Sequence, residues 1–101
     1  MGKQCGYDYS KGYSFRRWFI PAYMMGGLER YIEQGIPPSD FLCAVINNDL
    51  RSACDRADDN NLENLPAYMG FFYNEAPAGC WGFKGAVEQW CEKLFKEAQN
   101  G

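Results

Sequence analysis

The feature that most restricts the fold is a stripe of apolar residues at helical spacing in the middle of the chain. Apolar residues recur there every three or four positions, which defines one face of a helix. The stripe consists of Phe41, Leu42, Val45, Ile46, Leu50, Ala53, Cys54 and Ala57. Ser39 or Asp40 precedes it and offers a side chain that caps a helix. Asn47 to Asp49 interrupt the stripe and would allow a bend, but its period favours one continuous helix.

The same spacing predicts three further helices joined by short Pro/Gly connectors. They run from Pro21 to Gly35, from Asn64 or Leu65 to the residues before Ala76, and from Lys84 to Ala98. Gly26 and Gly27 lie inside the first of these, and each glycine weakens a helix by about 1 kcal/mol relative to alanine. They indicate either close approach to another helix or a ligand, or a break. The expected fold class is all-α: a compact four-helix domain over residues 20–101.

Residues 1–19 have no helical period and are expected to form an irregular basic and aromatic arm, with a short strand around residues 7–13 as the alternative. The basic residues of the arm are Lys3, Lys11, Arg16 and Arg17. Seven acids and two arginines follow between residues 40 and 75. This opposed charge, with an aromatic content of 17%, predicts a homo-oligomer with aromatic side chains at its interface. The alternatives are an ordinary solvated surface and a small core that uses large side chains.

Several classes of function are disfavoured by composition. A net charge of −3 argues against general nucleic-acid binding. The absence of histidine removes the commonest general base and metal ligand, so we expect no catalytic residues, no metal and no cofactor. The five cysteines lack CxxC spacing, and the polar start of the chain does not resemble a secretion signal. We therefore expect reduced thiols in the cytoplasm, with Cys43, Cys54 and Cys91 in the core, and no membrane span.

The most suggestive cluster for ligand binding surrounds two adjacent arginines. Arg16 and Arg17 are flanked by Phe15, Trp18 and Phe19, and guanidiniums beside aromatic rings suit a phosphate next to a stacked base. The alternative is that the aromatic residues pack into the core while both arginines face water. Other polar or aromatic residues beside the apolar stripes complete the candidate site. The candidate ligand-binding residues are Arg16, Arg17, Trp18, Tyr23, Tyr31, Asn48, Arg56 and Asn74.

The central part of the chain resembles a family of small uncharacterised proteins of tailed phages and prophages. The resemblance spans about Ile20 to Gly82. The residues that carry it are Ile20-Pro21-Ala22-Tyr23-Met24, Gly27-Leu28-Glu29-Arg30-Tyr31, Gly35-Ile36-Pro37-Pro38-Ser39-Asp40-Phe41-Leu42, Ala44-Val45, Asn48-Asp49-Leu50, Arg56-Ala57-Asp58, Tyr73-Asn74-Glu75-Ala76-Pro77 and Trp81-Gly82. The family brings no established activity, so the resemblance assigns no catalytic residue.

The phage context implies a protein that counters host defence in the cytoplasm of the bacterium. We expect it to sequester a nucleotide-derived immune signal without cleaving it, since sequestration needs no histidine. The alternative is an inhibitor that, like anti-CRISPR proteins, blocks a host defence complex by protein contact. Both rest on analogy of context. An oligomer with Arg- and Tyr-lined pockets would favour the first, and a monomer with an exposed acidic patch would favour the second.

Overall fold

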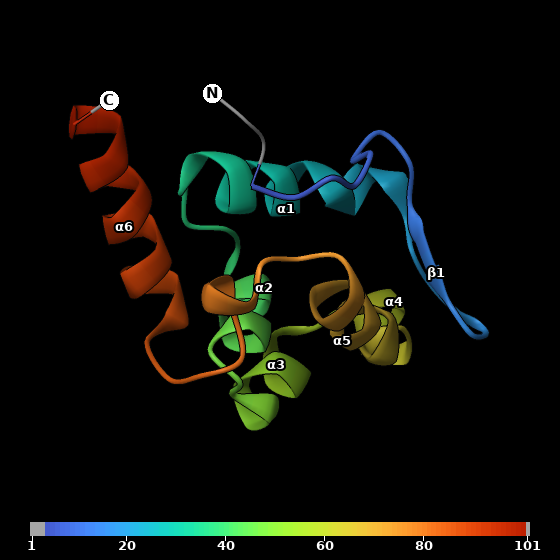
Figure 1. Cartoon of the computed structure of the whole chain (residues 1–101). Coiled ribbons are helices and arrows are strands. Elements are labelled where there is room, and N and C mark those ends of the chain that lie inside the picture. Colours follow the sequence, from blue (N-terminus) through green and yellow to red (C-terminus); the bar gives the residue numbers. More distant parts are fainter. Residues whose placement is uncertain (1–3, 101) are drawn as a thin grey trace.

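The structure is a computed structural model that describes residues 4–100, except for the side chain of Asn100. Lys3, counted above with the arm, lies outside the described residues. The elements, in chain order, are β1 (Tyr13–Phe15), β2 (Trp18–Ile20), α1 (Ala22–Gln34), α2 (Asp40–Ile46), α3 (Leu50–Arg56), α4 (Asp59–Glu63), α5 (Leu65–Asn74), the 3-10 helix η1 (Ala78–Cys80) and α6 (Ala86–Asn100) (Figure 1). The expectation of a mainly helical chain is confirmed, but neither the strict all-α class nor the count of four helices is correct.

The predicted continuous helix after Ser39 is instead two helices, α2 and α3. Asn48 has a φ of 61°, a left-handed conformation that ends the helical hydrogen-bond pattern. The side chains on either side stabilise the break. Asn47 Oδ1 accepts a hydrogen bond from the backbone N–H of Val87 at 3.0 Å, and Asp49 caps α3 through the N–H of Ser52 at 3.1 Å. The polar side chains therefore outweigh the apolar period that predicted one helix.

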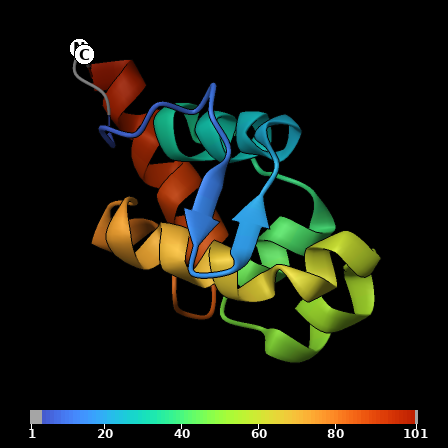
Figure 2. The same cartoon turned by 90° about the vertical axis from the view of Figure 1, so that its right-hand side faces the viewer.

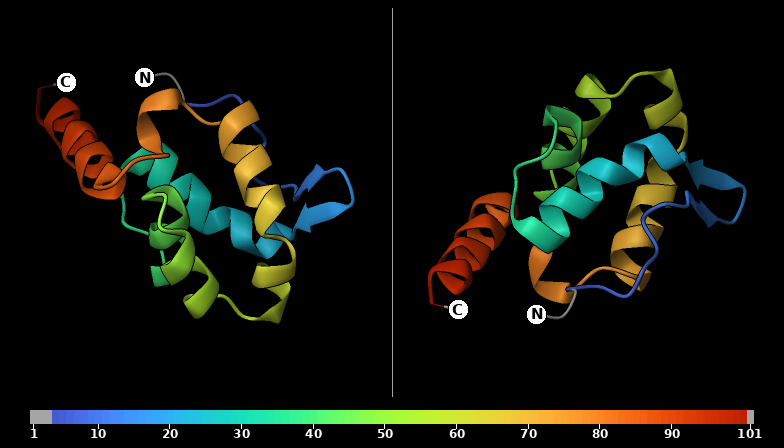
Figure 3. Two further views of the ribbon diagram at one scale, coloured as in Figure 1. Left: turned by 90° about the horizontal axis from the view of Figure 1, so that it is seen from below. Right: turned by 90° about the horizontal axis from the view of Figure 1, so that it is seen from above.

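The remaining helix boundaries follow local signals. Asp58 caps the short helix α4 by accepting the N–H of Asn61 at 2.8 Å. The predicted start at Asn64 or Leu65 is confirmed, with Pro66 in the first turn of α5. Helix α1 continues unbroken through its two glycines. Helix α6 begins at Ala86 rather than Lys84 and points away from the other helices (Figure 3).

The arm contains a β-hairpin rather than only irregular chain. Tyr13 pairs with Ile20 and Phe15 with Trp18, and Arg16 and Arg17 form the turn. The hairpin lies across α5 (Figure 2), and β2 spans the expected boundary between arm and helical domain at residue 20. The preceding segment is fastened to α1 by the Glu33 carboxylate. It accepts hydrogen bonds from the N–H groups of Gln4 and Cys5 and from the Tyr9 hydroxyl.

Large aromatic side chains fill much of the core. The Tyr31 hydroxyl donates to the carbonyl of Cys80 at 2.7 Å, and the Trp90 indole N–H donates to the carbonyl of Ile32 at 3.1 Å. These two bonds join α1 to η1 and α6. Around Phe71, the rings of Tyr7 and Tyr13 pack edge-on. Part of the aromatic content therefore lies in the core. This agrees with the alternative interpretation of the composition, a small core that uses large side chains.

The cysteines are distributed differently from the expectation. All five thiols are free. Cys5 and Cys80 are buried, whereas Cys43 and Cys91 are half-buried and Cys54 is exposed. The expected core position of Cys54 is wrong, because α3 is a separate helix and turns this side chain to the surface.

Candidate functional site

The outer face of α5 carries an open groove with a volume of about 960 Å³. Its walls come from the end of β1, from α4 and α5, and from the segment after η1. The lining residues are Phe15, Leu62, Glu63, Leu65, Pro66, Met69, Gly70, Tyr73, Asn74 and Trp81. We call this the α5 groove. Most of its lining is apolar, and a large apolar hollow of this kind is a typical binding site for a ligand or protein segment.

Helical spacing and one glycine explain the shape of the α5 groove. Pro66, Met69 and Tyr73 project from one face of α5. Gly70, on the same helix, lets the Phe15 ring lie against the helix backbone. Trp81 forms the far wall and is stacked on Phe72, with ring centroids 5.6 Å apart and an interplanar angle of 26°.

The groove has a cationic edge at the hairpin. The Arg16 guanidinium lies 5.4 Å from the centroid of the Phe15 ring, which is part of the lining. Neither Arg16 nor Arg17 forms an ion pair with a carboxylate of residues 4–100. Glu63 is the one carboxylate among the lining residues. The α5 groove therefore combines an apolar floor with the Arg16 guanidinium at one end, and Arg17 is the next residue of the hairpin turn.

The structure brings together only part of the sequence-predicted site. Arg16, Arg17 and Trp18 meet at the hairpin turn, where the Arg17 guanidinium lies 4.9 Å from the centroid of the Trp18 ring. Tyr23 is exposed at the start of α1. Tyr31 has no exposed surface, and its burial raises the pKa of its hydroxyl. Because its ring is buried, Tyr31 cannot stack on the base of a nucleotide. It belongs to the core and not to a surface site.

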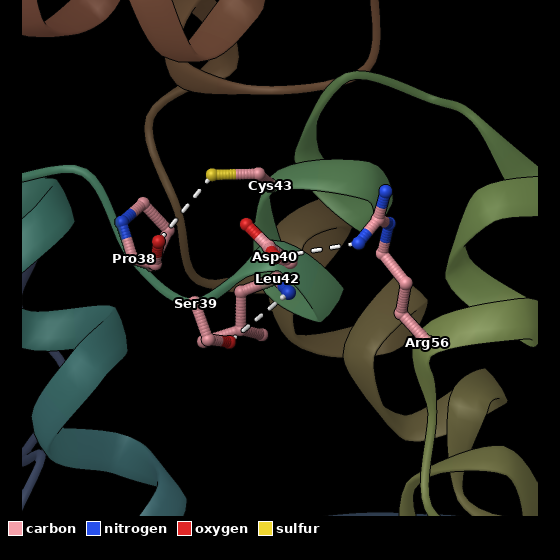
Figure 4. A network of polar contacts seen from close by, with 6 residues as sticks. All are labelled: Pro38, Ser39, Asp40, Leu42, Cys43 and Arg56. Carbon is pink, nitrogen blue, oxygen red and sulfur yellow. Dashed lines mark hydrogen bonds and ion pairs between the residues drawn. The ribbon is translucent and has the colours of Figure 1, made fainter.

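The other predicted site residues lie apart from the arginine pair. Arg56 forms an ion pair with Asp40 at 3.3 Å, joining α3 to the start of α2 (Figure 4). Asn48 occupies the break between α2 and α3. Asn74 donates from Nδ2 to the Tyr13 hydroxyl at 3.2 Å and also lines the α5 groove. These three residues have structural contacts, and only Asn74 is part of the groove.

Sequence reasoning missed the α5 groove, although a signal for it existed. Leu62, Met69 and Tyr73 belong to a run of apolar residues in and just before the third predicted helix. In the structure all three are exposed. Helix α5 is apolar around most of its circumference, and such a helix either is fully buried or presents an apolar face to a partner.

The chain matches no protein-family model, no curated protein and no solved structure. Within residues 4–100, no group of three or more Cys, Asp or Glu side chains is placed to hold a metal ion. In the same range, no helix has the length and apolar character that crossing a membrane requires.

Proposed function

We propose that the protein acts as a binding protein that blocks a partner by contact, with an apolar face of the partner held in the α5 groove. The observation that carries this proposal is the groove itself, which is open, mostly apolar and includes the exposed side chains of Leu62, Met69 and Tyr73. Contiguous exposed apolar surface on a small protein typically marks an interaction site. The groove supplies the apolar contact area, and no step of catalysis is needed.

The shape and charge of the groove favour an amphipathic helix of the partner. Such helices insert residues spaced three and four apart into apolar grooves. Arg16 and Arg17, which have no carboxylate partner within residues 4–100, complement an acidic residue on that helix. Few polar groups line the groove itself, and a phosphate-rich ligand would need several donors there. The lining therefore favours protein contact over nucleotide sequestration.

The resemblance to small phage proteins supplies the biological setting of the proposal. We propose that the partner belongs to a host defence complex in the bacterial cytoplasm, as for anti-CRISPR proteins. Binding at the α5 groove would cover a surface that the complex needs. The protein would then act stoichiometrically, by occupying its partner rather than by changing it.

The test is a phage-protection assay with two matched variants. In bacteria whose defence system restricts a test phage, the wild-type protein should restore plaque formation. Met69→Asp places a charge in the groove and should abolish protection. Phe83→Asp is the matched control, because Phe83 is 37% exposed and Met69 36%, and Phe83 does not line the groove. The same pattern is expected when the purified partner is titrated with each variant by calorimetry.

Two results would contradict the proposal. Full protection by Met69→Asp would remove the groove from the mechanism. A wild-type protein that protects the phage against no member of a panel of defence systems would remove the counter-defence setting.

Nucleotide sequestration is the second candidate, supported by the hairpin turn. Two guanidiniums lie there over aromatic rings, a combination suited to a phosphate and a base. Calorimetry against linear and cyclic nucleotides tests it. Changing Arg16 and Arg17 together to Ala should abolish binding while the helical spectrum stays unchanged, and the nucleotide should be recovered intact after heating the protein.

A further inference from the structure

A second hollow, of about 270 Å³, lies between α1 and the connector that leads into α2. Its lining combines polar and apolar groups from both segments: Tyr23, Met24, Gly27, Arg30, Ile36, Pro37, Pro38, Ser39 and Leu42. We call it the α1 pocket. Tyr23, Gly27 and Arg30 are spaced four and three residues apart, so they share one face of α1. An aromatic ring and a guanidinium therefore lie at the two ends of a glycine floor.

The paired glycines Gly26 and Gly27 leave space for the guanidinium of Arg30. A Cβ at Gly26 would lie 3.2 Å from Nη1 of Arg30, and a Cβ at Gly27 would lie 4.0 Å from Nη2. The guanidinium consequently lies beside the two glycines, on an exposed residue. Glycine destabilises a helix interior relative to alanine. Close packing of α2 explains the glycine pair only in part. A Cβ at Gly27 would lie 3.5 Å from Cδ1 of Leu42, which is an ordinary contact distance and leaves room for a side chain.

The charges around the α1 pocket leave Arg30 available to an anion. Among residues 4–100, Arg30 has no carboxylate partner. Asp40, next to the pocket residue Ser39, is paired with Arg56 (Figure 4). The Glu33 carboxylate is engaged by the N-terminal segment. Glu29 lies about 100° around the helix from Arg30.

The remaining groups of the pocket suit a flat, phosphorylated ligand. The Ser39 hydroxyl accepts the N–H of Leu42 at 3.4 Å and keeps its own hydrogen for a second acceptor. Tyr23 is 75% exposed and offers a free ring face. Pro37 and Pro38 supply a stiff apolar wall opposite α1. The volume lies just below the usual range for small-molecule sites, which fits one nucleotide unit rather than a longer chain.

From this arrangement we propose that the α1 pocket binds a nucleoside monophosphate. Arg30 and Ser39 hold the phosphate, and the base lies between Tyr23 and the two prolines. This site is separate from the α5 groove, so it extends the proposed function without depending on it. It also lies on residues other than Arg16 and Arg17, which carry the hairpin candidate.

Calorimetry with AMP, and separately with inorganic phosphate, tests the proposal. AMP should bind the wild-type protein, and phosphate should bind more weakly because it lacks a base. Arg30→Gln should weaken AMP binding by about tenfold or more, the usual effect of losing a charged hydrogen bond. Arg51→Gln is the matched control and should bind AMP as the wild type does, because Arg51 is an exposed arginine that does not line the α1 pocket. Tyr23→Leu should reduce AMP affinity and leave phosphate affinity unchanged.

A further variant separates the pocket from general stability. Gly27→Ala adds a methyl group to the pocket floor and removes a helix-weakening glycine, so it should weaken AMP binding without lowering the melting temperature. Wild-type affinity weaker than about 1 mM would overturn the proposal. Unchanged binding in Arg30→Gln would overturn it as well, and if the double variant Arg16→Gln, Arg17→Gln lost AMP binding while Arg30→Gln kept it, the nucleotide site would belong to the hairpin turn.

Discussion

Phe15 lies so close to Gly70 that a Cβ at residue 70 would be 2.5 Å from Cδ1 of its ring. This contact joins the hairpin to α5 and forms one edge of the α5 groove. The position of Phe15 in turn fixes Arg16, the next residue, beside the groove. A glycine inside α5 thus determines both the shape and the charged edge of the proposed binding surface.

We expect Gly70→Ala to destabilise the protein by about 1–3 kcal/mol, the usual effect of forcing extra volume into a packed site. The atoms that the new methyl group meets include Cγ and Cβ of Phe15, which cannot move without shifting the hairpin. Urea unfolding measures the effect. Gly79→Ala is the control, because its Cβ would meet only Trp90 at 4.0 Å. An equal loss in both variants would show that the Phe15 contact is not responsible.

Asn48 should be replaceable by glycine but not by a β-branched residue. Its φ of 61° is accessible to glycine and asparagine, whereas valine is strained there. Asn48→Val should therefore lower the free energy of unfolding by about 1–3 kcal/mol, and Asn48→Gly should leave it nearly unchanged. Thermal unfolding of both variants gives the comparison. A stable Asn48→Val protein would indicate that α2 and α3 can join into one helix.

The helices and the break at Asn48 show which parts of the fold could be predicted from the sequence and which could not. Apolar period and proline position were enough to predict α1, the start of α5 and most of α6. The period also continued across Asn48, so it did not reveal a break that depends on Asn47 reaching the N–H of Val87, forty residues away. The hairpin was missed because its strands have three residues each and are stabilised by packing on α5. In the candidate site, the helical period already places Tyr31 on the same face as Leu28 and Ile32, and that face is the buried one.

The buried tyrosines predict a loss of stability at alkaline pH. Burial is the main cause that raises the pKa of Tyr9, Tyr31 and Tyr68. In the unfolded chain a tyrosine ionises near pH 10. Above that pH the unfolded state releases protons that the folded state retains, so stability is complete below pH 10 and falls as the pH rises further. Urea unfolding at about pH 8 and pH 11 measures this change. Tyr31→Phe should reduce the slope, and an unchanged slope would exclude Tyr31 as a contributor.

A homo-oligomer remains a prediction of the chain's exposed apolar residues. Phe95 is 62% exposed on the part of α6 that points away from the other helices (Figure 3), and Met69 and Tyr73 are uncovered in the α5 groove. Sedimentation velocity at micromolar concentration should show a species larger than 11.5 kDa. If a second copy occupies the groove, Met69→Asp should produce the monomer and Phe83→Asp should not. A wild-type monomer throughout the concentration range would exclude self-association.

Gly27 is the position at which stability and the proposed nucleotide pocket should conflict. A methyl group there would meet Leu42 at 3.5 Å, an ordinary contact, so the substitution fits the fold. Alanine is favoured over glycine in a helix interior by about 1 kcal/mol, and Gly27→Ala should stabilise the protein by roughly that amount in urea unfolding. Leu28→Ala is the opposing control, because Leu28 is fully buried and its truncation should destabilise the protein by about 2–5 kcal/mol. A destabilised Gly27→Ala protein would mean that α2 packs too closely on this face to admit a side chain, and the glycine would then be explained by packing alone.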